Sequence, residues 1–466
     1  MMFGREVIYS SESVITKANV VDVLTKALSV HNRNQSEIAY LYKYYKGNQP
    51  ILRRKKTIRP EINNKIVENH ALEIVDFKKG YVFGEPVQYV RRGETEGVSE
   101  KITQLNEFMF AEDKAARDKE LAEWFYICGT AYRMVLPDSA LETDESPFEL
   151  DTLDPRYTFV VYNNGFGKKP LMGVKYIDTD TGILYSIYTP TVYFEVRNGI
   201  VEKEEAHVLK DIPIIEYPAN NARLGAFEVV LGLLDALNNT ASNRMDGIEQ
   251  FIQAFMKFVN CDIDEVQFAA LKEMGAIKIK GEPGNPADVG IVSSELNQTQ
   301  TQVTKDDIYQ MILIICGMPD RNGANRTTGD TGQAVILRDG WSAAESRARD
   351  SELVFKKSEK QFLRLVLRIC KDASNLELRL SDIDIKFTRN KTDNLLVKTQ
   401  GLQNMLEAGV HPQIAITNSG LFSDPEQTYL DSLPYLAKWL AAQATSTPSN
   451  NKPNPDGKQE EPEVNV

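Results

Sequence analysis

The sequence has few residues suited to covalent or metal chemistry. Its 466 residues include four cysteines and four histidines. The cysteines lie far apart in apolar contexts without metal-ligand spacing, so we interpret them as buried, reduced thiols. They are Cys128, Cys261, Cys316 and Cys370. The longest apolar run, MILIIC (311–316), is too short to cross a bilayer. The first residues lack the apolar core of a signal peptide, so we expect synthesis in the cytoplasm.

Catalytic motifs are missing as well. The sequence contains no G-x-x-x-x-G-K-[ST], H-E-x-x-H, G-x-S-x-G or Cys-x-x-Cys. DTDTG (178–182) has no glutamate at the spacing of an EF-hand loop, so it predicts a hairpin turn. Asp382 and Asp384 share one face of a predicted strand, as a metal site for phosphoryl transfer requires, but no further carboxylates support such a site. His70 has no suitably placed cysteine or serine, and we interpret it as structural. We therefore predict no enzyme activity, no metal and no cofactor.

The charge of the chain argues against a general affinity for nucleic acid. The net charge is −12, from 54 basic and 66 acidic residues, and a surface of this sign repels phosphate. The most basic stretch has two interpretations. In the first, its side chains contact phosphates. In the second, which we favour, they form a solvated arm or pair with acidic neighbours. The residues concerned are Arg53, Arg54, Lys55, Lys56 and Arg59.

The N-terminal half predicts helices followed by a sheet. Residues 16–46 predict two helices, the second capped by Ser36, with four tyrosines (40, 42, 44 and 45) that favour packing over base stacking. Residues 63–90 predict a helix through Ile66 and His70 and then a strand, and 100–135 predict further helices. Residues 130–217 alternate apolar and polar side chains between turn clusters, which predicts antiparallel strands joined by hairpins.

The region from 227 to 316 predicts two helices around a small module. Residues 227–260 carry an apolar stripe, and the opposite face is polar or acidic. That polar face contains Asp235, Asn239, Asn243, Asp246 and Glu249. Residues 262–303 predict a compact mixture of helix and strands, and 304–316 predict a helix that ends at Gly317. We expect the two helices to lie side by side.

A polar loop and a very long helix follow. The loop, DRNGANRTTGDTG (320–332), has no large apolar residue and cannot bury a core. A helical pattern begins at Gln333 and lasts about 40 residues, roughly 60 Å. Its apolar stripe contains Ala334, Leu337, Trp341, Ala344, Ala348, Phe355, Phe362, Leu365 and Ile369, with Ser351 and Ser358. Residues 376–390 then predict strands, 396–444 predict helices, and 445–466 predict a disordered tail. The chain as a whole predicts an α+β protein of two to four domains.

Three stretches together resemble a known family. They are NNKIVENHALEIVDFKKGYVFGEPVQYV (63–90), IPIIEYPANNARLGAFEVVLGLLDALN (212–238) and CGMPDRNGANRTTGDTGQAVILR (316–338). In combination they resemble signature regions of portal proteins, the head-to-tail connectors of tailed double-stranded DNA bacteriophages. The likeness is greatest to portals of long-tailed phages that infect Gram-positive bacteria, and it covers about residues 30–440. We keep another phage structural protein or a nucleic-acid-processing enzyme as alternatives.

The resemblance implies the parts of a phage portal fold. These are an N-terminal arm (1–29), a wing (30–226 and 333–395), two stem helices (227–261 and 304–319), a clip (262–303), a tunnel loop (320–332), a crown (396–444) and the disordered tail (445–466). We infer that the tunnel loop contacts DNA through Asn322, Asn325, Arg326, Thr327 and Thr328. The polar face of 227–260 is expected to line the channel.

The resemblance also implies a function and partners. Portals form twelvefold rings in the virion, at one vertex of the capsid, where DNA enters during packaging and leaves during ejection. The implied partners are the large terminase subunit, a head-completion adaptor, and the major capsid and scaffolding proteins, with assembly in the host cytoplasm and no membrane. Twelve helices spaced by about 10 Å form a ring near 38 Å across, which leaves a bore of about 28 Å, wide enough for a duplex.

Overall fold

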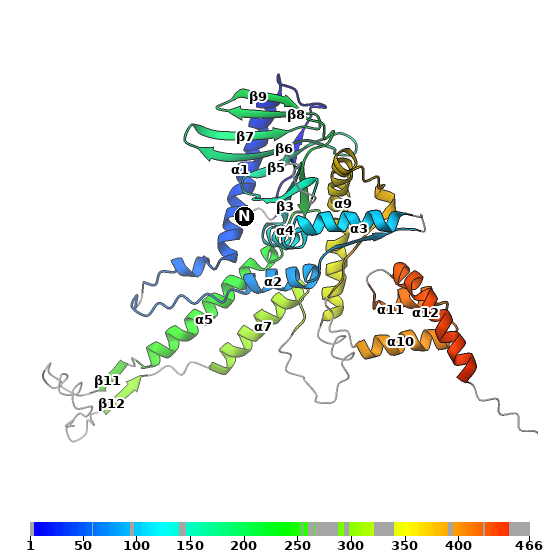
Figure 1. Cartoon of the computed structure of the whole chain (residues 1–466). Coiled ribbons are helices and arrows are strands. Elements are labelled where there is room, and N and C mark those ends of the chain that lie inside the picture. Colours follow the sequence, from blue (N-terminus) through cyan, green and yellow to red (C-terminus); the bar gives the residue numbers. More distant parts are fainter. Residues whose placement is uncertain are drawn as a thin grey trace, which may run out of the picture. The chain divides into compact units, whose positions relative to one another are not determined.

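The computed structural model divides the chain into two compact units, residues 1–390 and 391–466, which are described separately. Unit 1 mixes helices and strands and the described part of unit 2 is helical (Figure 1), which confirms the predicted α+β class. No helix within the described ranges is long and apolar enough to span a membrane. The structure describes residues 4–57, 59–93, 97–138, 146–252, 255–259, 266, 288–292, 298–320, 340–389, 395–422 and 425–446.

Helix α1 (Val20–Tyr45) is continuous, whereas the sequence predicted two helices. Ser36, the predicted N-cap, lies inside the helix, and its hydroxyl donates to Asn32 O at 2.9 Å. A serine that bonds to the preceding turn is tolerated inside a helix when tertiary packing holds both flanks. The tyrosines at its end pack as predicted, because Tyr44 is buried and the Tyr42 ring stacks on Trp124 with centroids 4.9 Å apart.

A six-stranded sheet lies against α1. Its strands follow the order β1-β5-β6-β7-β8-β9. They are β1 (Ile8–Ser10), β5 (Thr158–Asn163), β6 (Pro170–Thr179), β7 (Gly182–Tyr188), β8 (Val192–Arg197) and β9 (Ile200–Ala206). Strands β5 to β9 are antiparallel, as predicted, and β1 adds in parallel to β5. DTDTG forms the β6–β7 hairpin turn. Helix α1 covers one face, where Leu24 and Ala27 join the cluster of Phe159 and Met172 (Figure 1).

A smaller sheet connects this layer to the helices of unit 1. Its order is β10-β3-β4, with β3 (Thr130–Pro137), β4 (Phe148–Leu153) and β10 (Ile214–Pro218). The neighbouring helices are α2 (His70–Phe83), α3 (Val98–Ala111) and α4 (Lys114–Cys128). The predicted helix over 100–135 was wrong beyond Cys128. Helix α4 ends at Gly129, which has a φ of 81°. An added Cβ there would lie 1.9 Å from Arg223 O, so only glycine fits.

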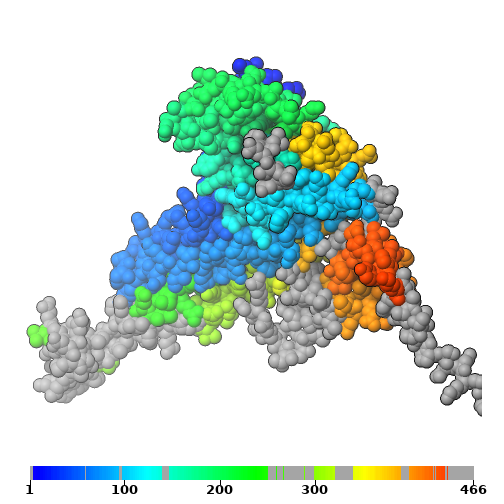
Figure 2. Space-filling model, viewed as in Figure 1, coloured from blue at the N-terminus to red at the C-terminus, as the bar shows by residue number. Residues whose placement is uncertain are grey.

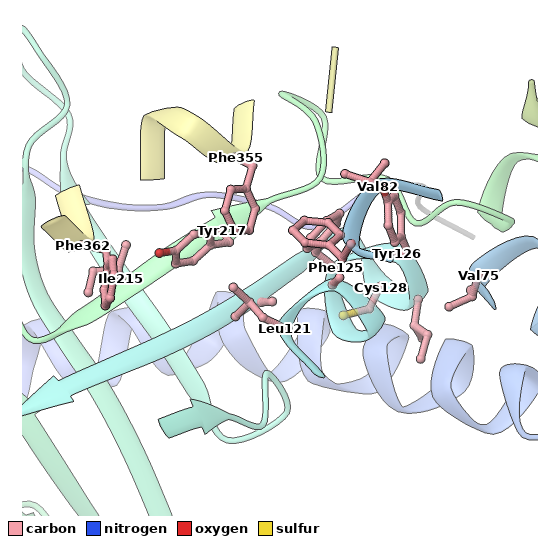
Figure 3. Close-up of a cluster of buried hydrophobic side chains, with 14 of the residues drawn as sticks. Val75, Val82, Leu121, Phe125, Tyr126, Cys128, Ile215, Tyr217, Phe355 and Phe362 are labelled. Carbon is pink, nitrogen blue, oxygen red and sulfur yellow. The ribbon is translucent and has the colours of Figure 1, made fainter. Parts of the chain in front are cut away.

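Helix α9 (Trp341–Ser374) is the longest element, with 34 residues, or about 51 Å. It begins after Gly340 at φ 82°, and the residues that precede Gly340 in the predicted helix, 333–339, lie outside the described ranges. Most of the predicted stripe is buried, which confirms the pattern: Ala344, Ala348, Phe355, Ser358, Phe362, Leu365 and Ile369. Figure 3 shows Phe355 beside Tyr217 and Phe362 beside Ile215, both of β10.

The predicted strands over 376–390 shrink to one, β13 (Ile383–Lys386), which pairs with β2 (Gln88–Arg91). Asp382 belongs instead to the 3-10 turn η3 (Leu380–Asp382), where its side chain accepts the Arg379 N–H at 3.3 Å. Asp384 pairs with Lys386 at 3.2 Å. The two carboxylates therefore do not form the shared strand face that the sequence suggested. Three predicted thiols, Cys128, Cys316 and Cys370, are buried and free, and Cys261 lies outside the described ranges.

A buried ionic network joins three elements of unit 1. Lys114 of α4 lies 2.7 Å from Asp118 Oδ2 and 2.9 Å from Glu359 Oε1 of α9. Arg133 of β3 pairs with Asp118 and lies 3.5 Å from Glu359 Oε2. The Glu359 carboxylate also accepts the hydroxyls of Tyr89 and Tyr217. Two cations balance two anions, so every charge in the network has a partner of opposite sign.

Unit 2 contains α10 (Leu395–Glu407), α11 (Pro412–Ser419) and α12 (Pro425–Ser446). The sequence predicted helices between 396 and 444, and α12 continues to Ser446, two residues into the predicted disordered tail. Ala415 and Ile416 of α11 are buried. Residues 447–466 of the predicted tail lie outside the described ranges.

We predict that Glu359→Ala destabilises the protein by about 3–5 kcal/mol, because it leaves Lys114 and Arg133 buried without their shared anion. Burial opposes ionisation of Glu359, but the two cations hold its pKa below the usual value. The network is therefore intact at neutral pH and its contribution is lost as pH falls through that pKa. Urea unfolding measures the change, and the exposed Glu377→Ala is the control, with little effect expected. Equal stability of the two variants at pH 7 would contradict a role for the network.

Candidate functional site

Two helices and a strand pair form the region that the sequence singled out. Helix α5 (Leu231–Ile252) follows the 3-10 turn η2 (Glu228–Val230), and α7 (Gln298–Cys316) lies beside it (Figure 1). Arg244 donates to Gln302 Oε1 between them at 2.6 Å. Between the two helices in the sequence, β11 (Phe255–Val259) pairs antiparallel with β12 (Asp288–Val292). The expected side-by-side arrangement is confirmed.

The limits of these helices differ from the prediction. The helix predicted over 227–260 ends at Ile252, and Phe255 and Val259, which were assigned to its stripe, lie in β11. Pairing with β12 supplies backbone hydrogen bonds to residues 255–259. The sequence of these residues alone does not reveal that partner. Helix α7 begins at Gln298 rather than Thr304.

The segment before α2 is fastened along α5 by a regular series of bonds. The backbone N–H groups of Asn64, Ile66 and Glu68 donate to side chains of α5 at 2.7, 3.0 and 2.8 Å. The acceptors are Asp246 Oδ1, Ser242 Oγ and Asn238 Oδ1, which follow one another by one turn of helix. Two residues of extended chain advance about 6.6 Å and four residues of helix about 6 Å, so the two spacings match. We call residues 62–69 the strap.

The strap covers part of the polar face that was expected to line a channel. Asp246 is 3% exposed under it. Asp235 accepts the Tyr44 hydroxyl at 2.9 Å, and Asn243 accepts a bond from Arg54 at 2.5 Å. Asn239 remains exposed. Part of this polar stripe therefore serves contacts within the chain, and the buried Asp246 does not face solvent, whereas channel lining by the rest of the face stays a prediction.

The basic stretch divides into paired and exposed residues. Arg54 and Lys56 lie 3.2 and 2.9 Å from Asp246 Oδ2. Burial alone would raise the pKa of Asp246, but bonds from Lys56 and Asn64 hold it below the usual value. Arg53 and Lys55 are exposed. The interpretation as partners of acidic neighbours is thus confirmed for Arg54 and Lys56, whereas contact with phosphate stays a prediction.

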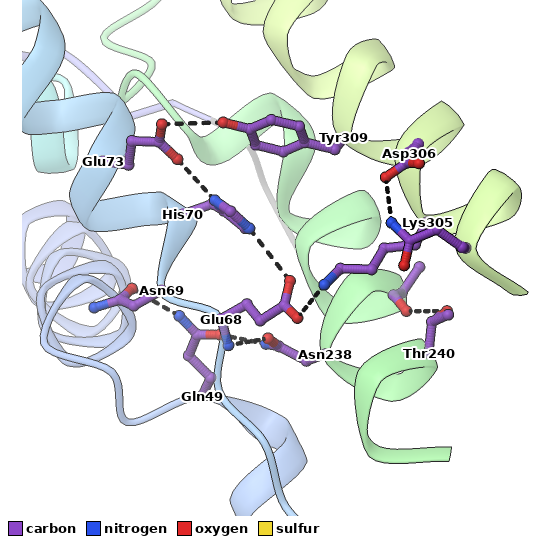
Figure 4. A network of polar contacts seen from close by, with 12 residues as sticks. Gln49, Glu68, Asn69, His70, Glu73, Asn238, Thr240, Lys305, Asp306 and Tyr309 are labelled. Atoms are coloured by element: carbon purple, nitrogen blue, oxygen red, sulfur yellow. Dashed lines mark hydrogen bonds and ion pairs between the residues drawn. The ribbon is translucent and has the colours of Figure 1, made fainter. Parts of the chain in front are cut away.

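A charged junction joins α2, the strap and α7 (Figure 4). His70 Nδ1 lies 2.7 Å from Glu73 Oε2, and its Nε2 lies 3.4 Å from Glu68 Oε2. From α7, Lys305 donates to Glu68 Oε1 at 2.6 Å and the Tyr309 hydroxyl donates to Glu73 Oε1 at 3.0 Å. Burial alone would lower the pKa of His70, but the two glutamates raise it to about 9. At neutral pH the junction therefore carries two positive and two negative charges.

The described ends of the polar loop approach each other. A Cβ at Gly340 would lie 3.6 Å from Met318 O and 3.7 Å from the Cα of Pro319. Gly317 ends α7 at φ 64°, and Lys78 of α2 donates to the last helical carbonyl, Cys316 O, at 2.7 Å. The chain thus leaves α7 and enters α9 at one place. The predicted DNA-contacting residues Asn322, Asn325, Arg326, Thr327 and Thr328 lie outside the described residues.

Sequence reasoning missed the residues that organise this region. Asn238 and Ser242 are fully buried, and they recur with Asp246 at four-residue intervals on α5. Such a series on one face of a helix with apolar flanks was a readable sign of a polar partner. Lys305 and Lys78 gave no comparable signal, because their partners are far away in the sequence. Within the described ranges no group of three His, Cys, Asp or Glu side chains is placed to hold a metal.

We predict that the His70 ring titrates near pH 9 in NMR spectra of the folded protein, whereas burial lowers the pKa of His31 to about 4. A raised pKa contributes stability below the unfolded value of about 6.5 that is lost as pH rises through 9. The difference in thermal stability between the natural chain and His70→Gln should therefore be largest at pH 6 and vanish above pH 9. A difference independent of pH would show that His70 acts by packing alone.

A protein-family comparison agrees with the resemblance to portal proteins. The model of the family "Phage portal protein, SPP1 Gp6-like" matches residues 25–444. No curated protein matches the chain. Among solved structures, a chain in the "Neck of empty GTA particle computed with C6 symmetry" is 11% identical with a TM-score of 0.46, covering 76% of this chain and 90% of that one. A chain in the "Virion of native gene transfer agent (GTA) particle" is 12% identical with a TM-score of 0.43, covering 84% and 92%.

The family match spans most of the two sheets of unit 1, the paired helices α5 and α7, the described ends of the loop and α9. Portal proteins are structural and non-enzymatic, in agreement with the missing catalytic motifs. The chain therefore belongs to the SPP1 Gp6-like family of phage portal proteins.

Proposed function

We propose that the protein forms a ring at one vertex of a phage capsid and that the ring is the channel for double-stranded DNA during packaging and ejection. The observation that carries the proposal is the family match over residues 25–444. The order of elements supports it, because a helix, a strand pair, a second helix, a polar loop and a long helix follow one another as portal architecture requires. The phages concerned are those with long tails that infect Gram-positive bacteria.

Each part of the chain has a place in this proposal. Helices α5 and α7 are the stem, the segment around β11 and β12 is the clip, and residues 320–332 are the tunnel loop. The sheets, α1 to α4 and α9 form the wing, and α10 to α12 form the crown. The clip binds the large terminase subunit and later a head-completion adaptor, while the wing contacts capsid and scaffolding proteins. Twelve copies make the ring in the virion.

Exposed apolar side chains on α7 support assembly with further copies. Val303, Met311 and Ile314 are 54%, 52% and 75% exposed. Met245 and Ile248 near the end of α5 are each 38% exposed, although they belong to its apolar stripe. Apolar residues grouped on paired helices are typical of surfaces that another protein covers. In a ring the neighbouring copy covers them.

We predict that Met311→Glu combined with Ile314→Glu abolishes ring formation, because it places two charges in an apolar contact. Analytical ultracentrifugation and negative-stain images measure the assembly. Ile200→Glu, at a residue 67% exposed on the edge strand β9, is the matched control and should assemble normally. Rings formed equally by the double variant and the natural chain would count against a stem contact through α7.

A second prediction concerns the loop. Because the described ends of the loop approach each other, removal of residues 322–330 with a short glycine closure should leave the stem and wing folded. We expect rings of normal mass that fail to package or retain a full-length genome. Replacing the same residues with glycine and serine at constant length separates the loss of length from the loss of side chains. Packaging at the natural level by the shortened variant would refute the proposed role of the loop.

A further inference from the structure

Helix α9 presents a basic stripe on the side that faces away from the core. The stripe contains Arg349, Lys357, Lys360, Arg364 and Lys371, all exposed, and it extends over about 33 Å of helix. Arg349 and Lys371 have partners on their own chain, Glu345 at 3.0 Å and Glu377 at 2.8 Å. Lys357, Lys360 and Arg364 have no acidic partner among the described residues. Leu353, 68% exposed, lies on the same stripe one turn before Lys357.

The same chain carries an acidic corner where α3 meets α4. Asp113 and Glu149 are exposed, and Glu112 accepts the Leu150 N–H beside them at 3.0 Å. Burial and the nearby charges of Glu149 and Asp138 raise the pKa of Glu112, so the carboxylates are close enough to repel one another. Phe110, 86% exposed, ends α3 next to them, and α3 is open to solvent on the face shown in Figure 2.

The stripe and the corner lie at separate places on unit 1. Lys114, the residue after Asp113, pairs with Glu359 on the buried side of the helix. Residues 357, 360 and 364 lie on the exposed side, because steps of three and four keep them on one face and that face excludes the buried Phe355, Phe362 and Val366. Each copy thus presents a positive surface and a separate negative surface. Two surfaces of opposite charge suit head-to-tail contacts between copies, and such contacts can close into rings. A two-fold contact would place like charges against each other and is disfavoured.

We propose that the basic stripe of α9, with Leu353, binds the acidic corner, with Phe110, of the next copy in the ring. The inference rests on the proposed function, since it names a contact between neighbouring wings. Charge and apolar character both match across the contact. One side combines basic side chains with Leu353, and the other combines acidic side chains with Phe110. DNA would suit the cationic side chains but not Leu353 among them. The contact is electrostatic at its rim, so salt weakens it.

The test is a charge exchange in the full-length protein. The triple variant Lys357→Glu, Lys360→Glu, Arg364→Glu should lose rings at 100 mM salt, as should Asp113→Lys with Glu149→Lys. The variant that combines both sets should regain them, because the signs are exchanged rather than removed. Lys26→Glu, Lys169→Glu and Lys210→Glu change the net charge equally at exposed sites elsewhere and should assemble normally. Circular dichroism checks that each variant is folded.

A crosslinking experiment makes the result independent of ring stability in isolation. Lys360→Cys with Glu149→Cys should give, on mild oxidation, a ladder of covalent multimers, while either single variant should not. Rings that persist in both reversed variants, or a missing ladder, would overturn the contact and leave the portal function standing. Normal rings with weakened DNA binding in the α9 variant would assign the stripe to nucleic acid and also overturn it. Absence of rings from the natural chain, even with scaffold and capsid protein, would overturn the portal function itself.

Discussion

The balanced charges around Glu359 determine where the layers of unit 1 meet. Lys114, Asp118 and Arg133 come from α4 and β3, and Glu359 comes from the middle of α9. A charge taken out of water needs partners with accurate geometry, so the network favours the arrangement in which all four side chains meet. Apolar packing around Phe355 and Phe362 supplies the driving force for burial, but it tolerates small shifts of a long helix. The ionic network is less tolerant of such shifts, and it holds α9 in position along its axis.

The strap imposes a comparable constraint on α5. Backbone N–H groups bond to Asn238, Ser242 and Asp246 at matched spacing, so a shift of the strap by one residue would break all three bonds at once. The junction at His70 then connects the same strap to α7 through Lys305 and Tyr309. Helices α5 and α7 are thereby held by polar contacts on one side. Their exposed apolar residues, such as Met311 and Ile314, lie elsewhere.

The sequence was sufficient wherever a pattern is local. The stripe of α9, the hairpins between Thr158 and Ala206, and the helices of unit 2 follow from periodicity and turn chemistry. It failed where distant partners decide the outcome. Ser36 has the sequence features of an N-cap, yet tertiary packing keeps the chain helical through this residue. Phe255 and Val259 continue a helical spacing, yet β12 recruits them into a strand. The polar face of α5 was visible, but its partner, the strap, lies far away in the sequence and cannot be read from α5 alone.

The distribution of charge connects these contacts to the proposed conduit. Two basic residues of the 53–59 stretch, Arg54 and Lys56, share Asp246 as an acidic partner within the chain. The protein has a net charge of −12, and some of its basic side chains pair with acidic side chains of the same chain. It therefore offers DNA few sites that bind phosphate firmly. Weak, scattered attraction suits a surface past which a polyanion must slide, since each firm phosphate contact would have to be broken at every step. Under the proposed function, Lys357, Lys360 and Arg364 of α9, which have no acidic partner among the described residues, act between protein chains, where permanent contacts are an advantage.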